Sequence, residues 1–253
     1  MLSIVLLGTG NVATHLFQAF SDAKGVEVIQ VYGRNQNALK TFGGEVPVST
    51  SMENLVRADI YILAVSDESI REASEFLMDM PGLIVHTSGS VSLDALETKR
   101  KGVFYPLQTF TKGKKVDFSE LPICVEAKNE HDFLLLETLG KSITNQVHRV
   151  SSKQREKLHL SAVLVNNFPN HLYTIAKELC DENEIPFDLL RPLISETVDK
   201  IRFLSPVEAQ TGPARRNDIT TMQRHLEQLT NPLHQKIYQL LSESIKERHE
   251  KEL

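Results

Sequence analysis

The sequence predicts an α/β protein in which a doubly wound, mainly parallel sheet is followed by an all-α region. Three observations support this class. Short apolar runs alternate with helical patterns up to about residue 150, the first of these runs leads directly into a glycine turn, and strand patterns stop after residue 150. We therefore divide the chain into a sheet domain, residues 1–150, and a helical domain, residues 151–253.

The composition is that of an ordinary globular protein. Hydrophobic residues make up 41% and charged residues 24% of the 253 residues, and the formal net charge of −5 argues against a nucleic-acid surface. Cys124 and Cys180 stand far apart in the sequence, so neither a metal site nor a redox pair is predicted. No signal peptide and no membrane-spanning run are recognisable, and we expect a cytoplasmic protein without a membrane partner.

The first strand and the turn after it form the most informative segment. Residues 4–7 are all apolar, which predicts a strand buried on both faces, and a helical pattern begins a few residues later. Between strand and helix lies a Gly-x-Gly-x-x-Ala pattern, which consists of Gly8, Thr9, Gly10, Asn11, Val12 and Ala13.

Each small residue of this pattern has a physical use. Gly8 permits the turn, Gly10 lets the backbone approach a diphosphate at the positive end of the helix, and Ala13 lets helix and strand pack closely. The same pattern also occurs in ordinary turns. Its place between a strand and a helix favours a Rossmann-type dinucleotide site.

The end of the second predicted strand, residues 26–32, indicates which dinucleotide binds. An acidic residue usually holds the ribose 2′-hydroxyl of NAD there, whereas a basic residue accommodates the 2′-phosphate of NADP. The segment Gly33, Arg34 and Asn35 contains no acid, so we predict NADP(H) and assign these three residues to its binding. The alternative is that Arg34 is a solvated loop arginine.

Two further strands, residues 59–65 and 83–86, are expected to end at the same crevice, because the carboxyl ends of parallel strands face the ligand. Ser66 can contact the cofactor or cap the next helix with equal plausibility. Capping is favoured for Asp67, because a carboxylate would repel phosphates. The residues assigned to cofactor contact are Val65, Ser66, Ser88 and Gly89.

The remaining elements are predicted from their periodicity. A helix that begins near residues 49–53, with Ser49 or Thr50 as its cap, is expected after a short third strand. The other predicted strands are residues 46–48, 102–105, 122–126 and 146–150. The predicted helices of the second half are residues 153–181, 187–204, 214–229 and 232–248.

The first long helix carries candidate catalytic groups. Pro169 must kink or break it and free backbone groups near residues 165 and 166. His159 and Asn166 fall roughly on one face of this helix, with Asn167 at its edge. They are either site residues or hydrogen-bonded groups of the core or of the helix junction.

Several segments together resemble a known family. The chain is similar to predicted oxidoreductases that join an NADP-binding Rossmann domain, like that of pyrroline-5-carboxylate reductase and deazaflavin-dependent NADP reductase, to a helical domain of unknown function. Tyr105 stands where the family usually has His, and Asn217 where it usually has Gly. The matching segments are residues 8–13, 86–89, 106–110, 159–168 and 211–213, with Arg216 and Asp218.

The resemblance implies a reductase that transfers hydride between NADPH and a small carbonyl or imine in an interdomain cleft. It makes the second domain a substrate and homodimerisation domain. His159 and Asn167 are then the candidate catalytic residues that orient or protonate the substrate. No metal is expected. The candidate substrate-binding residues are Tyr105, Gln108, Asn166, Thr211 and Gly212.

Three functions remain possible from the sequence alone. The chain is either such a reductase, or a binding module in which NADP(H) alters the contacts of the helical domain with a partner. A third possibility is hydride exchange between NADP and a deazaflavin, which requires a flat apolar slot beside the nicotinamide.

Overall fold

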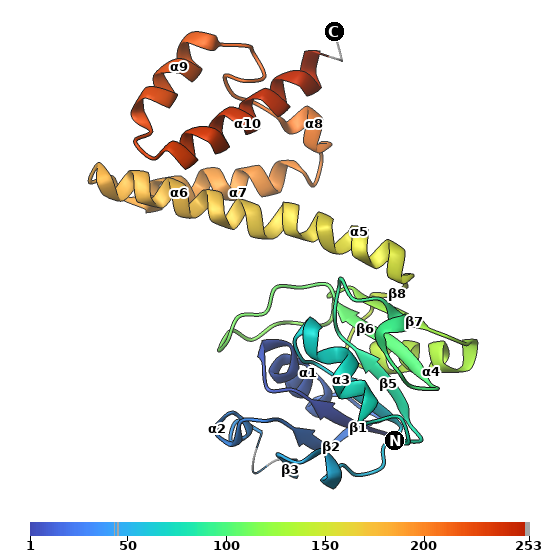
Figure 1. Cartoon of the computed structure of the whole chain (residues 1–253). Coiled ribbons are helices and arrows are strands. Elements are labelled where there is room, and N and C mark those ends of the chain that lie inside the picture. The colour runs from blue at the N-terminus through green and yellow to red at the C-terminus, as the bar shows by residue number, and fades with distance from the viewer. Residues whose placement is uncertain (43, 45, 251–253) are drawn as a thin grey trace. The chain divides into compact units, whose positions relative to one another are not determined.

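The computed structural model describes residues 1–42, 44 and 46–250 (Figure 1). By its internal contacts the chain divides into two compact units, Met1–Asn167 and Phe168–Leu253, which we describe separately. The helices of the second half begin at Ser152, next to the predicted border at residue 150, whereas the first compact unit continues to Asn167. The predicted fold class is confirmed, because a mostly parallel sheet with helices is followed by a helical region.

The sheet has eight strands in the order β3-β2-β1-β4-β5-β6-β7-β8. All neighbouring strands are parallel except β6 and β7. The first six follow the strand order of doubly wound dinucleotide-binding sheets, in which the ligand crevice lies where the order reverses, here between β1 and β4. The strands are β1 (Leu2–Leu7), β2 (Val26–Tyr32), β3 (Val48–Ser49), β4 (Ile60–Leu63), β5 (Leu83–His86), β6 (Lys101–Pro106), β7 (Ile123–Ala127) and β8 (Val147–Arg149).

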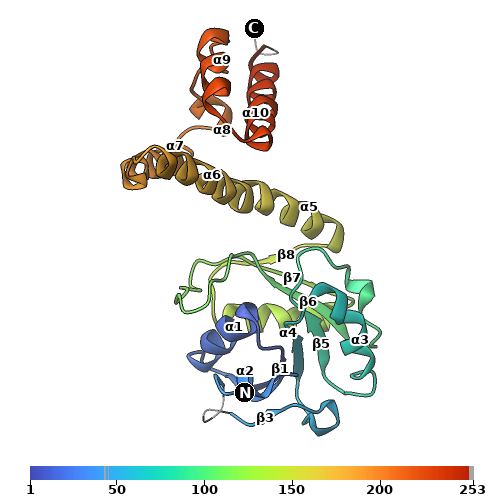
Figure 2. The same cartoon turned by 60° about the vertical axis from the view of Figure 1, so that its left-hand side comes forward.

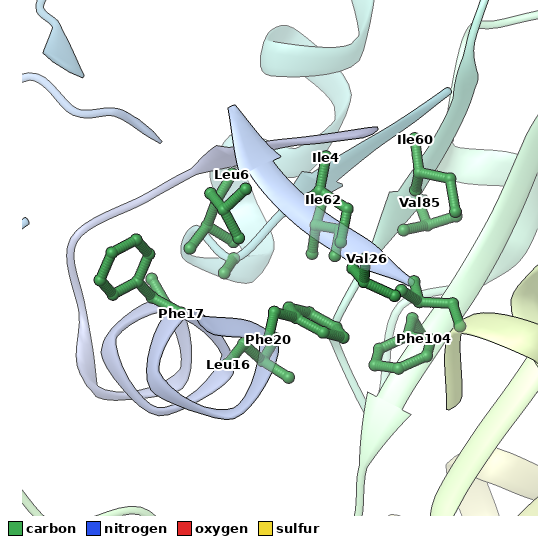
Figure 3. Close-up of a cluster of buried hydrophobic side chains, with 14 of the residues drawn as sticks. Ile4, Leu6, Leu16, Phe17, Phe20, Val26, Ile60, Ile62, Val85 and Phe104 are labelled. Atoms are coloured by element: carbon green, nitrogen blue, oxygen red, sulfur yellow. The ribbon is translucent and has the colours of Figure 1, made fainter. Parts of the chain in front are cut away.

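Helices cover both faces of this sheet, and Figure 2 shows α1 and α3 on opposite sides of it. On one face, side chains of α1 such as Leu16 and Phe20 pack against Ile4 and Leu6 of β1 (Figure 3), and α4 adds Leu136 to the same cluster. On the other face the alternate residues of the strands pack against α3. The α-helices of the first unit are α1 (Asn11–Ser21), α2 (Gln36–Leu39), α3 (Ile70–Glu75), α4 (Glu130–Lys141) and α5 (Ser152–Ala162).

Short segments differ from the sequence prediction. The third strand is shifted to Val48–Ser49, and the segment after it forms a single 3-10 turn, Met52–Asn54, in place of a helix. Ser51 caps this turn by accepting from the Glu53 amide, so the predicted caps at Ser49 and Thr50 are wrong. Ser49 instead pairs with β2 as the end of β3, which takes it out of capping reach. The other 3-10 turns of the first unit are Asp67–Ser69 and Leu93–Ala95.

The long helix expected around Pro169 is present as α5, a π-helical turn over Val163–Asn167, and α6 (Phe168–Glu182). Proline has no N–H, so Pro169 cannot donate to the carbonyl of Val165 four residues earlier. The interruption falls on the turn that contains this carbonyl, as the sequence predicts. Ser151 begins α5 with a capping box formed with Gln154.

The second unit is entirely helical in its described residues. After α6 come a 3-10 turn (Phe187–Leu190), α7 (Arg191–Lys200), α8 (Pro206–Ala209), α9 (Ile219–Gln228) and α10 (Pro232–Glu250) (Figure 1). The α9 helix begins five residues later than predicted from residue 214, because Asp218 caps it by accepting from the Thr221 amide. A hydrogen bond of 2.8 Å between His225 and Tyr238 joins α9 to α10. Among the described residues, no helix is both long and apolar enough to span a membrane.

Candidate functional site

The glycine turn after β1 has a backbone geometry that requires glycine. Gly8 has φ +132°, and a Cβ atom at this position would lie 2.1 Å from the carbonyl oxygen of Ala64. Gly10 is the N-cap residue of α1 and provides no side-chain cap, so the first amides of this helix can receive a ligand. A Cβ atom at Gly10 would meet nothing within 4 Å. The turn is therefore a tight one that leaves open space at the positive end of a helix, which suits a diphosphate.

A groove of about 440 Å³ lies at this turn. The groove is also lined by three residues that were not assigned to cofactor binding from the sequence, namely Tyr32, Ala64 and Thr87. All three lie at the carboxyl end of a strand or directly after it, and this position could have predicted their place in the groove. Ten of the predicted cofactor residues line the groove, namely Gly8, Thr9, Gly10, Asn11, Val12, Gly33, Arg34, Asn35, Val65 and Ser66.

Three other predicted cofactor residues do not line the groove. Ala13 is fully buried, as the close packing of α1 on the sheet requires. Ser88 holds the turn after β5, because its Oγ accepts hydrogen bonds from the amides of Ser90 and Val91. Gly89 lies against the side chains of His159 and Tyr105, where a Cβ atom would come within 2.5 Å of His159 Nδ1. A cofactor role for these three residues stays a prediction.

The end of β2 contributes the only charged side chain that lines the groove within the described residues, the exposed Arg34. The side-chain oxygen of Asn35 accepts from the amides of Asn37 and Ala38 and so caps α2, which fixes the loop that carries Arg34. Gly33 lets this loop approach the turn after β1, since a Cβ atom there would lie 2.4 Å from Thr9 Cγ2. A glycine cradle with one guanidinium fits a dinucleotide that carries an additional phosphate.

A second cavity, of about 590 Å³, lies between α1, the loop after β6, and α5 with its π-helical turn. Asn11 and Val12 line both this cavity and the groove, so the two spaces adjoin at the start of α1. The loop after β6 is tied to α1 by a hydrogen bond from Asn11 Nδ2 to the Phe110 carbonyl, 2.9 Å long. The structure brings five of the predicted catalytic and substrate-binding residues together in this cavity, namely Tyr105, Gln108, His159, Asn166 and Asn167.

Tyr105 and His159 form a hydrogen-bonded pair in this cavity. The Tyr105 hydroxyl lies 3.1 Å from His159 Nδ1, and the two rings are almost perpendicular. Tyr105 is 8% exposed, and burial raises the pKa of its hydroxyl above the ordinary value. This hydroxyl therefore stays protonated and available as a hydrogen-bond donor at neutral pH.

A buried ion pair fixes α5 one turn before His159. Arg155 is 1% exposed and donates to Glu126 of β7 and to the Val91 carbonyl, at 2.6 and 2.5 Å. Ser152 of the same helix donates to Glu126 and accepts from the Leu93 amide. Arg155 was not predicted from the sequence, because it lies in the charged run 153–157, which is typical of a solvated helix face.

His86, at the end of β5, is a buried histidine near this ion pair. It is 0% exposed, and its Nδ1 accepts from the Ser88 amide while Nε2 has no partner in the described parts of the chain. Burial, together with the nearby Arg155 guanidinium, lowers the pKa of His86 to about 4. The ring is therefore neutral at physiological pH and stabilises the loop after β5.

Thr211 and Gly212 belong to the second unit, Phe168–Leu253, and their predicted contact with substrate stays a prediction. Gly212 has φ +105°. Asn217 adopts φ +54°, a conformation that Asn tolerates better than most other side chains. This explains how Asn can replace the usual glycine there. No group of three His, Cys, Asp or Glu in the described ranges could hold a metal ion.

The comparisons with known proteins agree with this geometry. A putative NADP oxidoreductase from Bacteroides fragilis has 38% sequence identity and a TM-score of 0.88, with 97% of this chain and 98% of that chain covered. The chain belongs to the family of this protein. A family model described as a domain of unknown function, DUF2520, matches residues 121–245. A comparison with curated proteins finds no match.

Two more distant structures share the fold. An imine reductase variant from Myxococcus stipitatus in complex with NAD+ has 14% identity and a TM-score of 0.62, with 98% and 95% of the two chains covered. Pyrroline carboxylate reductase from Plasmodium falciparum with NADP bound has 13% identity and a TM-score of 0.56, with 97% and 98% covered. At these identities the likeness supports the fold.

Proposed function

We propose that the chain is an NADPH-dependent reductase of a small carbonyl or imine. The observation that carries this proposal is the pair of adjoining cavities within Met1–Asn167. One has a diphosphate cradle and a guanidinium, and the other has an ionisable imidazole with four side-chain amides, of which that of Asn11 binds the Phe110 carbonyl. They meet at Asn11 and Val12, so a dinucleotide in the groove can extend its nicotinamide end toward the second cavity. The relatives named above bind NADP or NAD+, or bear the name of an NADP oxidoreductase.

The roles of the residues follow from their chemistry. Bound NADPH supplies a hydride to the carbon of the C=O or C=N group, and one proton from solvent completes the product. His159 lines the second cavity, and its imidazole can orient or protonate the receiving atom. Asn167, with Asn166 and Gln108, can hold the substrate through amide hydrogen bonds.

Turnover and cofactor binding separate the reductase from a mere binding module. We expect NADPH oxidation with at least one member of a panel of small oxo-acids, ketones and cyclic imines. His159→Ala and Asn167→Ala should lower kcat/KM by about 100-fold or more and leave the Kd for NADPH within about twofold. His131→Ala, on an exposed position of α4, is the matched control and should change neither value.

The opposite result has a definite meaning. Tight NADPH binding without oxidation by any panel member would contradict the reductase and favour the binding module. Oxidation by a deazaflavin alone, followed by its absorbance change, would favour hydride exchange between the two cofactors.

The helical unit supports a second proposal, a homodimer formed through Phe168–Leu253. In the described residues of this unit, Cys180 and Ala214 are the only buried apolar side chains. Fourteen large apolar side chains are exposed there, among them Leu189, Phe203 and Leu240. A self-complementary partner would cover such a surface. Light scattering should give the mass of a dimer at micromolar concentration, and a monomer mass would reject this proposal.

The predicted cytoplasmic location stays a prediction.

A further inference from the structure

We propose that Tyr105 fixes the tautomer of His159, so that the ring presents its Nε2–H group to the cavity as a hydrogen-bond donor. A substrate of this protein would then carry a hydrogen-bond acceptor at the reacting group, either a carbonyl oxygen or an unprotonated imine nitrogen. The tautomer follows from the geometry alone, whereas the substrate class rests on the proposed reductase function.

The direction of the hydrogen bond decides the tautomer. A phenol hydroxyl is a strong donor, and the lone pair of a neutral imidazole is a strong acceptor. His159 Nδ1, at 3.1 Å, is the hydrogen-bond partner of the Tyr105 hydroxyl within the described residues, and with this hydroxyl as the donor the ring proton of the neutral form is on Nε2. Nε2 makes no hydrogen bond to the protein among residues 1–42, 44 and 46–250, and His159 lines the cavity. Tyr105, at the Nδ1 side of the His159 ring, thus determines that the substrate would meet an N–H group at Nε2.

The surroundings hold both rings in place. Tyr105 is the last residue but one of β6 and is paired with Cys124 of β7, so its hydroxyl comes from the rigid sheet. Leu158 packs on the same buried cluster, and Arg155 anchors α5 one turn before His159. Gly89 provides the space for the pair, because a Cβ atom there would lie 2.5 Å from His159 Nδ1 and 2.9 Å from Tyr105 Cζ.

An Nε2–H donor discriminates between substrates by charge. It stabilises the oxygen of a ketone or aldehyde, on which negative charge grows as hydride adds to the carbon. A protonated iminium offers only an N–H group at the same place, and two facing donors repel. We therefore expect ketones and aldehydes, or imines that are neutral at the assay pH, to be reduced faster than permanently charged N-alkyl iminium ions.

The experiment measures the tautomer and the activity separately. The free protein, labelled with 15N-histidine, is examined by NMR at about pH 8. We expect His159 to carry its proton on Nε2. Tyr105→Phe, which keeps the ring, should give a mixture of tautomers and lower kcat about tenfold, the value of one hydrogen bond, with the Kd for NADPH unchanged. Gly89→Ala should disturb the same resonances, since it displaces the pair without removing either functional group.

Tyr238→Phe is the matched control. Tyr238 forms the same kind of bond, 2.8 Å to Nδ1 of His225, in the helical unit. This variant should alter the His225 resonances and leave NADPH oxidation unchanged. The proposal is overturned if His159 carries its proton on Nδ1, if Tyr105→Phe leaves the tautomer as it was, or if iminium ions are the faster substrates. A correct tautomer in a protein that never oxidises NADPH would instead contradict only the reductase function.

Discussion

Two glycines of the turn after β1 separate a requirement of folding from one of binding. Gly8 combines φ +132° with a carbonyl 2.1 Å from any Cβ atom, so Gly8→Ala should destabilise the protein by more than about 2 kcal/mol. Gly10 has open space around its Cα, and Gly10→Ala should cost only about 1 kcal/mol as a poorer N-cap. Its methyl group would fill space that we assign to the diphosphate, so the affinity for NADPH should fall by at least about tenfold. Urea unfolding and fluorescence titration check the two effects, and equal losses of stability would contradict this division.

His86 should make the protein sensitive to acid. Its pKa is about 4 in the folded protein, against an ordinary value near 6.5. Above pH 6.5 the ring is neutral in both states and does not affect stability. As the pH falls from 6.5 to about 4, the His86 ring binds a proton in the unfolded chain but stays neutral in the folded protein. The free energy of unfolding should therefore drop by about 3 kcal/mol. Urea unfolding across this range should show a smaller drop for His86→Leu than for the wild type, and identical slopes would exclude His86 as the cause.

Single residues of the site differ in how far the sequence predicts them. The glycine turn after β1 and Arg34 stand at a fixed spacing from a strand. Ten of the predicted cofactor residues line one groove. Arg155 and His86 could not be found in this way. Their importance comes from burial, and burial depends on which elements pack over them.

At the scale of elements, the Arg155–Glu126 ion pair should control the attachment of α5. Arg155→Met leaves Glu126 charged and without its partner, which should cost about 3–5 kcal/mol of stability. The double variant with Glu126→Leu removes the isolated charge and should recover part of this loss. Chemical denaturation of the two variants measures the difference. A double variant as unstable as the sum of both single variants would show that the pair is not coupled.

The elements themselves were mostly predictable. Long periodic segments such as α1, β2 and the α5–α6 region appear where the sequence places them, and the interruption before Pro169 follows from the missing N–H. Short elements shifted by a few residues. The third strand and the start of α9 depend on local hydrogen bonds, from the pairing of Ser49 with β2 and the capping by Asp218, which periodicity does not encode.

At the scale of the whole molecule, one compact unit holds all the chemistry that the structure brings together. The groove and the adjoining cavity both lie in Met1–Asn167, so the residues that we propose for cofactor choice and for catalysis belong to this one unit. The helical unit has almost no buried apolar side chains among its described residues, which is why the sequence could predict its helices but not what covers them.

The most direct test of the account is an equilibrium titration of the protein with NADPH and NADH, followed by the fluorescence of the cofactor. We predict that NADPH binds at least about tenfold more tightly than NADH, because Arg34 can form a charge-assisted pair with the 2′-phosphate. Arg34→Ala should bring the two Kd values together. Equal or tighter binding of NADH by the wild type, or binding of neither cofactor, would contradict the account.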